Sequence, residues 1–270
     1  MTHGALATSG YIMEDPREAA RLELKVDSRA WVQKYLAPRI HAGAAVLSVG
    51  CGPGAILGAL AALDSSVRAT GIDISPDRVE EAKRRHRGNP RLAFVCGDAQ
   101  AMQFPSDSFD LVYSRMLLEY LQAKEQAVAE MVRVCKPGGR VLLQDLDGQL
   151  LWHYPEDAAV QRTVERILAG LAPGGFDSFV GRKLFWLAQR AGLKNLAVQV
   201  EGYHVIAGAI TPTALEQWEL KLAIARPQLA RFLGGDETAQ AATRQFLEYL
   251  RRPDTLTYSV QFTVTGEKPS

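Results

Sequence analysis

The chain has 270 residues, of which 47% are hydrophobic, so it can bury a large core as one domain or as a domain with a substantial insertion. Its 31 Lys and Arg residues balance 30 Asp and Glu residues, and the formal charge of +1 gives no global field that would steer it toward nucleic acid. The three cysteines include no CxxC pair, which argues against a zinc site or disulfide bridges. We expect no metal, no membrane insertion and, without a visible secretory signal, a cytoplasmic location.

The N-terminal part shows no regular pattern up to residue 10, and residues 16–36 then follow the spacing of an amphipathic helix. A charged row, formed by Glu18, Arg21 and Lys25, lies on one face of this helix. Spacing alone favours a solvent-exposed ion-pair row for these three residues over a ligand-binding role.

A glycine-rich loop follows a short apolar run in the stretch VLSVGCGPG, residues 46–54. The apolar run suits a buried parallel strand, which is hydrophobic on both faces. The glycines allow a tight turn and a close approach of the backbone to a ligand, and the Ala/Leu-rich run after them predicts a helix whose free N–H groups point back at the loop. Strand, glycine turn and helix indicate a nucleotide-type cofactor site, although Gly50-x-Gly52-x-x-Ala55 alone also fits dinucleotide-binding folds.

Strand and helix patterns then alternate along the chain, which predicts a parallel, doubly wound sheet. The expected strands after the first are 67–73, 91–96, 109–114 and 140–145, and the main expected helices begin at 75 and cover 117–135. In such sheets, ligands bind outside the carboxyl ends of the strands. Four features fall at those ends: the glycine loop, Asp73, Asp98 and Ser114.

The pattern changes beyond residue 147, where helical segments predominate. We expect helices at 156–171, 181–191, 212–225 and 239–251, and strands at 194–205 and 256–265. The last strand alternates apolar and polar residues and should therefore be antiparallel. Arg226-Pro227 and Gly234-Gly235 are expected in the connection between the last two helices.

Four segments carry a resemblance to a known family: VLSVGCGPG, GIDIS, CGDAQAMQFPSDSFDLVYSRMLLEYL and KPGGRVLLQD. In the order, spacing and residue identities of these segments, residues 44–146 resemble a class I S-adenosylmethionine-dependent methyltransferase. The flanks, from Tyr11 through Glu18-x-x-Arg21 and in DLDGQLLWHYPED, resemble bacterial small-molecule methyltransferases of the ubiquinone/menaquinone and natural-product type.

The resemblance implies an α/β fold with a Rossmann-like, doubly wound, seven-stranded sheet whose last strand is antiparallel. An N-terminal helical segment (1–40) would close over the cofactor, followed by a cofactor-binding core (41–146). The remainder of the sheet (147–270) would carry a helical substrate cap (211–252).

The family's cofactor, S-adenosylmethionine, implies a role for each strand end. Asp73 would accept hydrogen bonds from the ribose hydroxyls, and Asp98 with the Ala99 backbone would meet the adenine. The glycine loop and residues 114–116 would border the methionine part, while Tyr11 and Arg21 would fold over the site. The expected cofactor-binding set is Tyr11, Arg21, Gly50, Cys51, Gly52, Asp73, Ile74, Arg78, Gly97, Asp98, Ala99, Ser114, Arg115 and Met116. Asp98 as a turn cap and Arg115 as a surface charge are the structural alternatives.

The implied reaction is an in-line attack of an O, N, C or S atom of the acceptor on the sulfonium methyl. The leaving thioether is neutral, so a general base is needed only if the nucleophile must lose a proton early. The candidate catalytic residues are Asp147, His153 and Tyr203, each equally compatible with a structural role. Many relatives carry a histidine where this chain has Tyr120, which leaves that histidine's role open here.

The apolar and aromatic content of residues 147–180 and 207–255 predicts an enclosed pocket for a small, largely apolar organic acceptor, in a monomer or homodimer. Two other functions stay open. An NAD(P)-dependent oxidoreductase shares the glycine loop and the acid after the second strand, but it does not explain Gly97-Asp98-Ala99 or the KPGG segment. A non-catalytic S-adenosylmethionine-binding module is also compatible, because an intact cofactor site does not prove turnover.

Overall fold

The computed structural model describes residues 27–270, apart from the side chains of residues 149–151. Tyr11, Arg21 and most of the predicted helix 16–36 lie outside the described residues. The described chain begins with α2 (Ser28–Trp31), a π-helical turn η1 (Val32–Leu36) and a 3-10 turn η2 (Ala37–Arg39). Asp27 caps the start of α2, because its side chain accepts a hydrogen bond from the Ala30 N–H at 2.9 Å.

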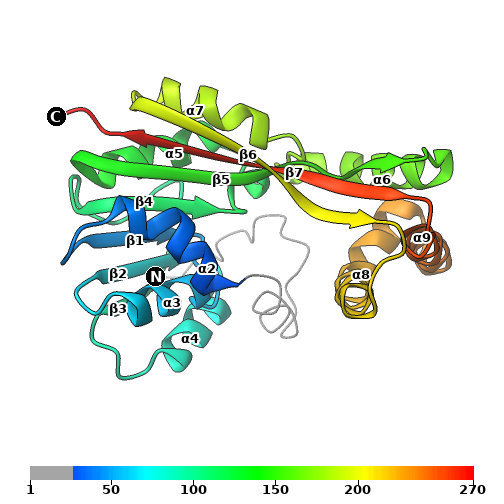
Figure 1. The fold of residues 1–270 in the computed structure, drawn as a ribbon, viewed down its shortest axis with the longest axis horizontal. Helices are drawn as coiled ribbons and strands as arrows, with labels where there is room; N and C mark the ends of the chain where they lie inside the picture. The colour runs from blue at the N-terminus through cyan, green and yellow to red at the C-terminus, as the bar shows by residue number, and fades with distance from the viewer. Residues whose placement is uncertain (1–26) are drawn as a thin grey trace, which may run out of the picture.

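Seven strands form one sheet in the order β3-β2-β1-β4-β5-β7-β6 (Figure 1). They are β1 (Ala45–Val49), β2 (Arg68–Asp73), β3 (Leu92–Cys96), β4 (Phe109–Arg115), β5 (Cys135–Tyr154), β6 (Lys194–Ala207) and β7 (Leu256–Glu267). Strands β1 to β5 pair in parallel, and β7 runs antiparallel to both β5 and β6. The predicted doubly wound sheet with an antiparallel last strand is confirmed.

Helices cover both faces of the sheet, so the molecule has three layers. On one face, η1, α3 (Ala55–Leu63) and α4 (Pro76–Arg85) share a buried cluster with side chains such as Val46. On the other face, α5 (Lys124–Val134) and α7 (Leu184–Arg190) share a cluster with Leu47. Successive residues of β1 thus point into opposite cores, which explains the unbroken apolar run of this strand.

The last three strands extend beyond the carboxyl ends of β1 to β4 as an arm (Figure 1). Strand β5 has 20 residues, far more than the predicted 140–145. At the far end of the arm lie α6 (Ala158–Leu171), α8 (Pro212–Leu233) and α9 (Asp236–Leu250), which we call the helical cap. The cap has buried clusters of its own, so it packs around an apolar core separate from those of the sheet.

The cap differs from the sequence prediction at Pro227. A helix break was expected there, but α8 continues from Pro212 to Leu233 with Pro227 inside it. Proline removes one helical hydrogen bond and crowds the preceding turn. Ile224, Leu229 and Leu233 are buried in one apolar cluster of the cap, and this burial offsets that cost. Within residues 27–270, no helix combines the length and the apolar character needed to cross a membrane.

Candidate functional site

The carboxyl ends of the first four strands border a cleft with about 660 Å³ of non-protein space, open solvent included. Its lining consists of Gly50, Ile72, Asp73, Ile74, Arg78, Gly97, Asp98, Ala99, Gln100, Met116, Leu117, Tyr120 and Leu121. The structure therefore brings eight of the predicted cofactor residues into one cleft. Ile72, Gln100, Leu117 and Leu121 were not predicted to line it, because their side-chain types do not point to ligand binding.

The glycine loop and the end of β2 are locked together. Gly50, Gly52 and Gly54 all have positive φ, at 73°, 52° and 79°, so the turn requires residues without a Cβ. The Asp73 carboxylate accepts hydrogen bonds from the Gly52 N–H at 2.8 Å and the Ser75 N–H at 3.0 Å. Each carboxylate oxygen keeps a further lone pair, so Asp73 can still accept hydrogen bonds from a ligand.

Cys51 lies within this loop, and its Sγ occupies the space that a side chain on Gly71 would need. Burial is the largest of the effects that raise the pKa of Cys51, and the nearby Asp73 carboxylate adds to it. A thiol held neutral is a poor nucleophile. The geometry therefore agrees with a packing role for Cys51 beside the cleft.

One wall of the cleft is a turn that the sequence predicted as helix. The Asp145 carboxylate, fully buried, accepts hydrogen bonds from the N–H groups of Leu117 (3.1 Å) and Glu119 (3.3 Å). These bonds hold Leu118–Tyr120 as a 3-10 turn, and α5 begins only at Lys124. The predicted helix start at 117 was wrong because the carboxylate that captures these N–H groups lies 28 residues further along the chain.

Asp145 should make stability depend on pH. Its burial and the nearby Glu119 carboxylate raise the pKa of Asp145 well above its usual range. The folded state therefore binds this proton more tightly than the unfolded state, so the Asp145 contribution to stability falls as pH rises from about 4 to the raised pKa. We expect Asp145→Asn, which stays neutral, to gain thermal stability relative to the native chain across this window. Parallel pH dependences of the two melting temperatures would contradict this.

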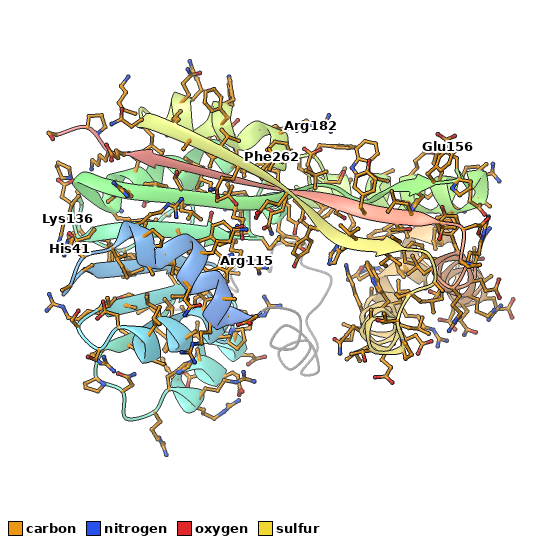
Figure 2. All side chains as sticks on the ribbon, in the orientation of Figure 1. His41, Arg115, Lys136, Glu156, Arg182 and Phe262 are labelled. Atoms are coloured by element: carbon orange, nitrogen blue, oxygen red, sulfur yellow. The ribbon has the colours of Figure 1, made fainter. Side chains whose placement is uncertain are left out.

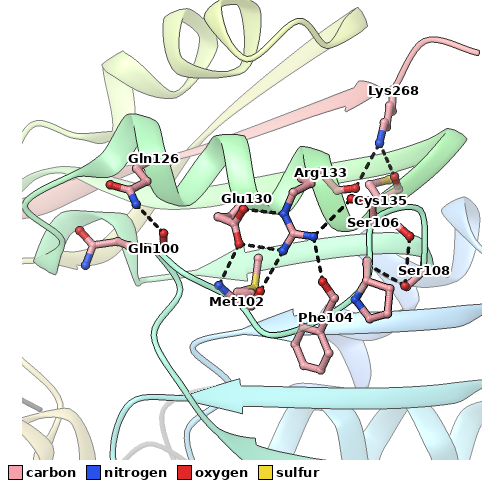
Figure 3. Close-up of polar contacts among 11 residues, drawn as sticks. Gln100, Met102, Phe104, Ser106, Ser108, Gln126, Glu130, Arg133, Cys135 and Lys268 are labelled. Atoms are coloured by element: carbon pink, nitrogen blue, oxygen red, sulfur yellow. Dashed lines mark hydrogen bonds and ion pairs between the residues drawn. The ribbon is translucent and has the colours of Figure 1, made fainter.

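The segment after β3 forms the opposite wall and is fastened to α5 (Figure 3). The Arg133 guanidinium donates hydrogen bonds to the carbonyls of Met102 (2.9 Å) and Phe104 (2.8 Å). Glu130 pairs with Arg133 and also accepts from the Met102 N–H at 2.8 Å. Gln126 donates to the Gln100 carbonyl at 2.8 Å. The sequence does not single out Arg133 and Glu130, because their spacing is that of any charged pair on a helix surface.

Removing the Arg133 guanidinium should loosen the segment after β3 that it holds against α5. We expect Arg133→Met to lower the free energy of unfolding by about 2 kcal/mol, because two carbonyls and Glu130 lose a charged donor while the Arg side chain is only partly buried. Urea denaturation measures this loss. The exposed Arg84, which pairs with Glu81 on α4, is the control, and Arg84→Met should leave the midpoint unchanged. An equal loss in both variants would show that the clamp contributes nothing specific.

The three predicted catalytic residues lie apart from one another. The buried Asp147 carboxylate is engaged by Arg182 through the backbone N–H (2.9 Å), Nε (2.9 Å) and Nη2 (2.6 Å). His153 lies on β5 beside the cap, where its Nδ1 is 3.1 Å from Thr257 Oγ1 and its ring contacts Tyr249 of α9. This geometry favours structural roles for Asp147 and His153.

The position of His153 along the arm supports that conclusion. Gln144, whose carbonyl accepts a hydrogen bond from the N–H of the cleft residue Met116 at 2.9 Å, pairs with Thr263, whereas His153 pairs with Thr257. These β7 partners are six residues apart, which corresponds to about 20 Å along the strand. His153 is therefore far from any methyl group bound in the cleft.

Tyr203, the third predicted catalytic residue, contacts a side chain that adjoins the cleft. Its hydroxyl is 3.4 Å from Nη2 of Arg115, a long hydrogen bond. Arg115 directly precedes Met116, which lines the cleft, and Figure 2 shows it where the body of the sheet meets the arm. Among the described residues, the buried Nε of Arg115 and Oγ of Ser114 have no hydrogen-bond partner. Tyr11 and Arg21 lie outside the described residues, and their roles stay predictions.

Comparisons with known proteins identify the domain that contains this cleft. The family described as "Methyltransferase domain" matches residues 47–143. An uncharacterized 37.1 kDa protein in a transposon of Streptomyces fradiae is 31% identical over 70% of this chain, which spans only 56% of that protein. Malonyl-[acyl-carrier protein] O-methyltransferase of Herminiimonas arsenicoxydans is 27% identical, and the match covers 68% of this chain and 74% of the relative.

Solved structures share the fold. Phosphoethanolamine N-methyltransferase 2 of Haemonchus contortus, in complex with phosphomonomethylethanolamine and S-adenosylhomocysteine, superposes with a TM-score of 0.57 and 18% identity. The match covers 90% of this chain and 52% of that one. At this identity the likeness concerns the fold alone. Residues 47–143 of this chain are therefore a methyltransferase domain.

Proposed function

We propose that this chain binds S-adenosylmethionine and transfers its methyl group to a small, largely apolar organic acceptor by in-line displacement. The observation that carries the proposal is the Asp73 carboxylate at the end of β2, fixed to the Gly52 N–H beside a cleft of about 660 Å³. Doubly wound sheets bind nucleotide-type ligands at this edge, outside the carboxyl ends of the strands.

The residues present fit that cofactor. A carboxylate accepts hydrogen bonds from hydroxyl donors, so Asp73 would hold the ribose. A Cβ on Gly52 would meet no atom within 4 Å, so the loop backbone borders open space that a ligand can approach. Ile74 and Arg78 would flank the adenine, and Asp98 with the Ala99 backbone would meet its polar edge.

The bound cofactor would supply an activated methyl group and leave as a neutral thioether. The chain's own residues then need mainly to orient the acceptor, and orientation can contribute on the order of 7–11 kcal/mol. Arg115 and Tyr203 are the groups that we assign to acceptor binding, because Arg115 lies between the cleft and the arm. We do not assign Asp147 or His153 to the reaction.

Calorimetry with S-adenosylmethionine and with NAD tests the cofactor directly. We expect binding of the first and none of the second, and the reverse would overturn the proposal. Incubation with labelled S-adenosylmethionine and pools of small metabolites then tests turnover. Binding without any labelled product would favour a non-catalytic module, whereas efficient labelling of tRNA would contradict a small acceptor.

The thiols and the net charge bear on the compartment and the partner. The three thiols, Cys51, Cys96 and Cys135, are free, which fits a reducing compartment such as the cytoplasm. The near-neutral charge supplies no surface for phosphates, so we propose that the protein acts on a free small molecule and not on nucleic acid.

Tyr203 and His153 can be separated by mutation. We expect Tyr203→Phe to lower kcat/KM for the acceptor about tenfold, because its hydroxyl lies beside Arg115, and to leave S-adenosylmethionine affinity unchanged. His153→Gln is the matched control on the far part of the arm and should leave kcat/KM unchanged. A larger loss for His153→Gln than for Tyr203→Phe would reverse the assignment.

A further inference from the structure

One face of the sheet carries a cation that no acid of the described chain neutralises. Within residues 27–270, the guanidinium of Arg115 forms no ion pair, and its Nη2 lies 3.4 Å from the Tyr203 hydroxyl. Its Nε is buried and, in the same part of the chain, has no acceptor. Both side chains stay partly exposed, so a ligand can approach the end of the guanidinium. Because charges removed from water are normally paired, this arrangement points to an anion that the described residues do not supply.

The pairing register places further donors on the face that carries Arg115. Arg115 pairs with Gln144 on β5, which pairs with Thr263 on β7. Gln261 lies two residues from Thr263 on β7, so its side chain shares this face. Tyr203 pairs with β7 a further two residues along and shares it as well. The contact between Arg115 and Tyr203 therefore spans β5 and β7 at the level of Gln261.

The neighbouring acids are directed elsewhere or already paired. Asp145 and Asp147 occupy the alternate positions of β5, so their carboxylates face the other side of the sheet. Glu201 on β6 pairs with Gln261 in the register and shares the cationic face. Its carboxylate accepts hydrogen bonds from Lys34 Nζ and the Tyr35 hydroxyl. Among the described residues, the charge of Arg115 therefore stays without a counter-ion.

Two glutamines on this face differ in how their amides are satisfied. Gln144 accepts a hydrogen bond from Trp31 Nε1 at 2.8 Å and donates one to Thr263 Oγ1 at 2.7 Å. Gln261 is only 6% exposed, and within the described part of the chain its buried Nε2 makes no hydrogen bond. A buried donor without an acceptor lowers stability. The unsatisfied amide beneath the contact between Arg115 and Tyr203 is therefore best explained as a donor to a ligand.

We propose that the methyl acceptor carries a carboxylate, which binds to the guanidinium of Arg115 and the amide of Gln261, beside Tyr203. One cation matches a monoanion, and the planar edge of a guanidinium matches the two oxygens of a carboxylate. That this acid is the acceptor rests on the proposed methyl transfer and on the position of Arg115, next to the cleft residue Met116. The carboxylate site itself does not depend on that function.

The experiment compares probes that share one apolar body and differ in charge. 2-Naphthoate, 2-naphthamide and 2-naphthyl phosphate are titrated calorimetrically at pH 7 into the full chain, alone and saturated with S-adenosylhomocysteine. Arg115→Met removes the cation, and Gln261→Leu removes the amide at similar size. Arg29→Met is the charge-matched control, because Arg29 is exposed on α2, the helix whose Trp31 covers the same face. Thermal melting reports whether each variant is folded.

We expect the native chain to bind naphthoate about tenfold more tightly than naphthamide. Arg115→Met should abolish this preference, and Arg29→Met should retain it. Gln261→Leu should weaken naphthoate binding about fivefold without lowering the melting temperature, since the buried amide satisfies no partner in the free protein. A glutamine with a purely structural role would show the opposite combination.

The carboxylate site is overturned if the native chain shows no preference for naphthoate, or if folded Arg115→Met keeps it. Tighter binding of naphthyl phosphate than of naphthoate would overturn the choice of a carboxylate. S-adenosylhomocysteine binding is measured separately. A naphthoate preference without any S-adenosylhomocysteine binding would leave the carboxylate site standing and overturn the proposed function instead.

Discussion

Replacing Asp73 with alanine is expected to weaken S-adenosylmethionine binding about a hundredfold while the protein stays folded. A hydrogen bond to a charged group contributes about 1.5–3 kcal/mol, and Asp73 would make two with the ribose hydroxyls. The same change frees the Gly52 N–H, which the carboxylate holds at 2.8 Å, and so loosens the glycine loop. Calorimetry measures the dissociation constant directly.

The matched control is Asp77, an exposed acid in the first turn of α4, only four residues away. Asp77→Ala removes the same charge from the same edge of the sheet without reaching the cleft lining. Its dissociation constant should equal that of the native chain. A native dissociation constant for Asp73→Ala would mean that the ribose is held elsewhere, and an equal loss in both variants would point to a general field effect.

Replacing Asp147 with alanine should lower the free energy of unfolding by about 3 kcal/mol. It should leave the kcat of the folded protein unchanged. The carboxylate is buried and takes three donors from Arg182, and removing one partner of a buried ion pair typically costs about 3–5 kcal/mol. We expect the lower end because half of the Arg182 side chain is exposed. The pair fastens the turn at Gly181–Lys183 to β5.

Urea denaturation measures this loss, and a comparison variant tests its cause. Asp254 pairs with Arg252 on the surface, so Asp254→Ala should leave the denaturation midpoint unchanged. Under conditions where Asp147→Ala is still folded, its kcat should match the native value. A folded Asp147→Ala chain of native stability but without turnover would restore Asp147 as a catalytic candidate.

The part of the site that could be predicted from sequence is the part built from local signals. The strand before Gly50 is apolar on both faces, the loop needs glycines for its positive φ, and Asp73 is the last residue of the next strand. Each of these features depends only on nearby residues. Strand order then brings them to one edge of the sheet without any further information.

The parts of the site that could not be predicted all depend on partners that are distant in sequence. Asp145 turns the start of a predicted helix into a loop, and Arg133 fastens the segment after β3 to α5. Tyr203 and His153 have different surroundings because they lie at different places along the arm. No local sequence pattern predicts the length of this arm. Pro227 remained helical because burial in the cap outweighs its local preference.

The arm has one further consequence, which concerns length. Strand β5 is one unbroken element that carries Gln144 beside the cleft residue Met116 and His153 beside the cap, and its register to β7 shifts between Asp147 and Trp152. Because this one strand runs from the body of the sheet into the arm, its length fixes how far the cap lies from the cleft, at roughly 3.3 Å per residue. Related chains with a longer or shorter arm would then hold their caps at a correspondingly different distance from the cleft.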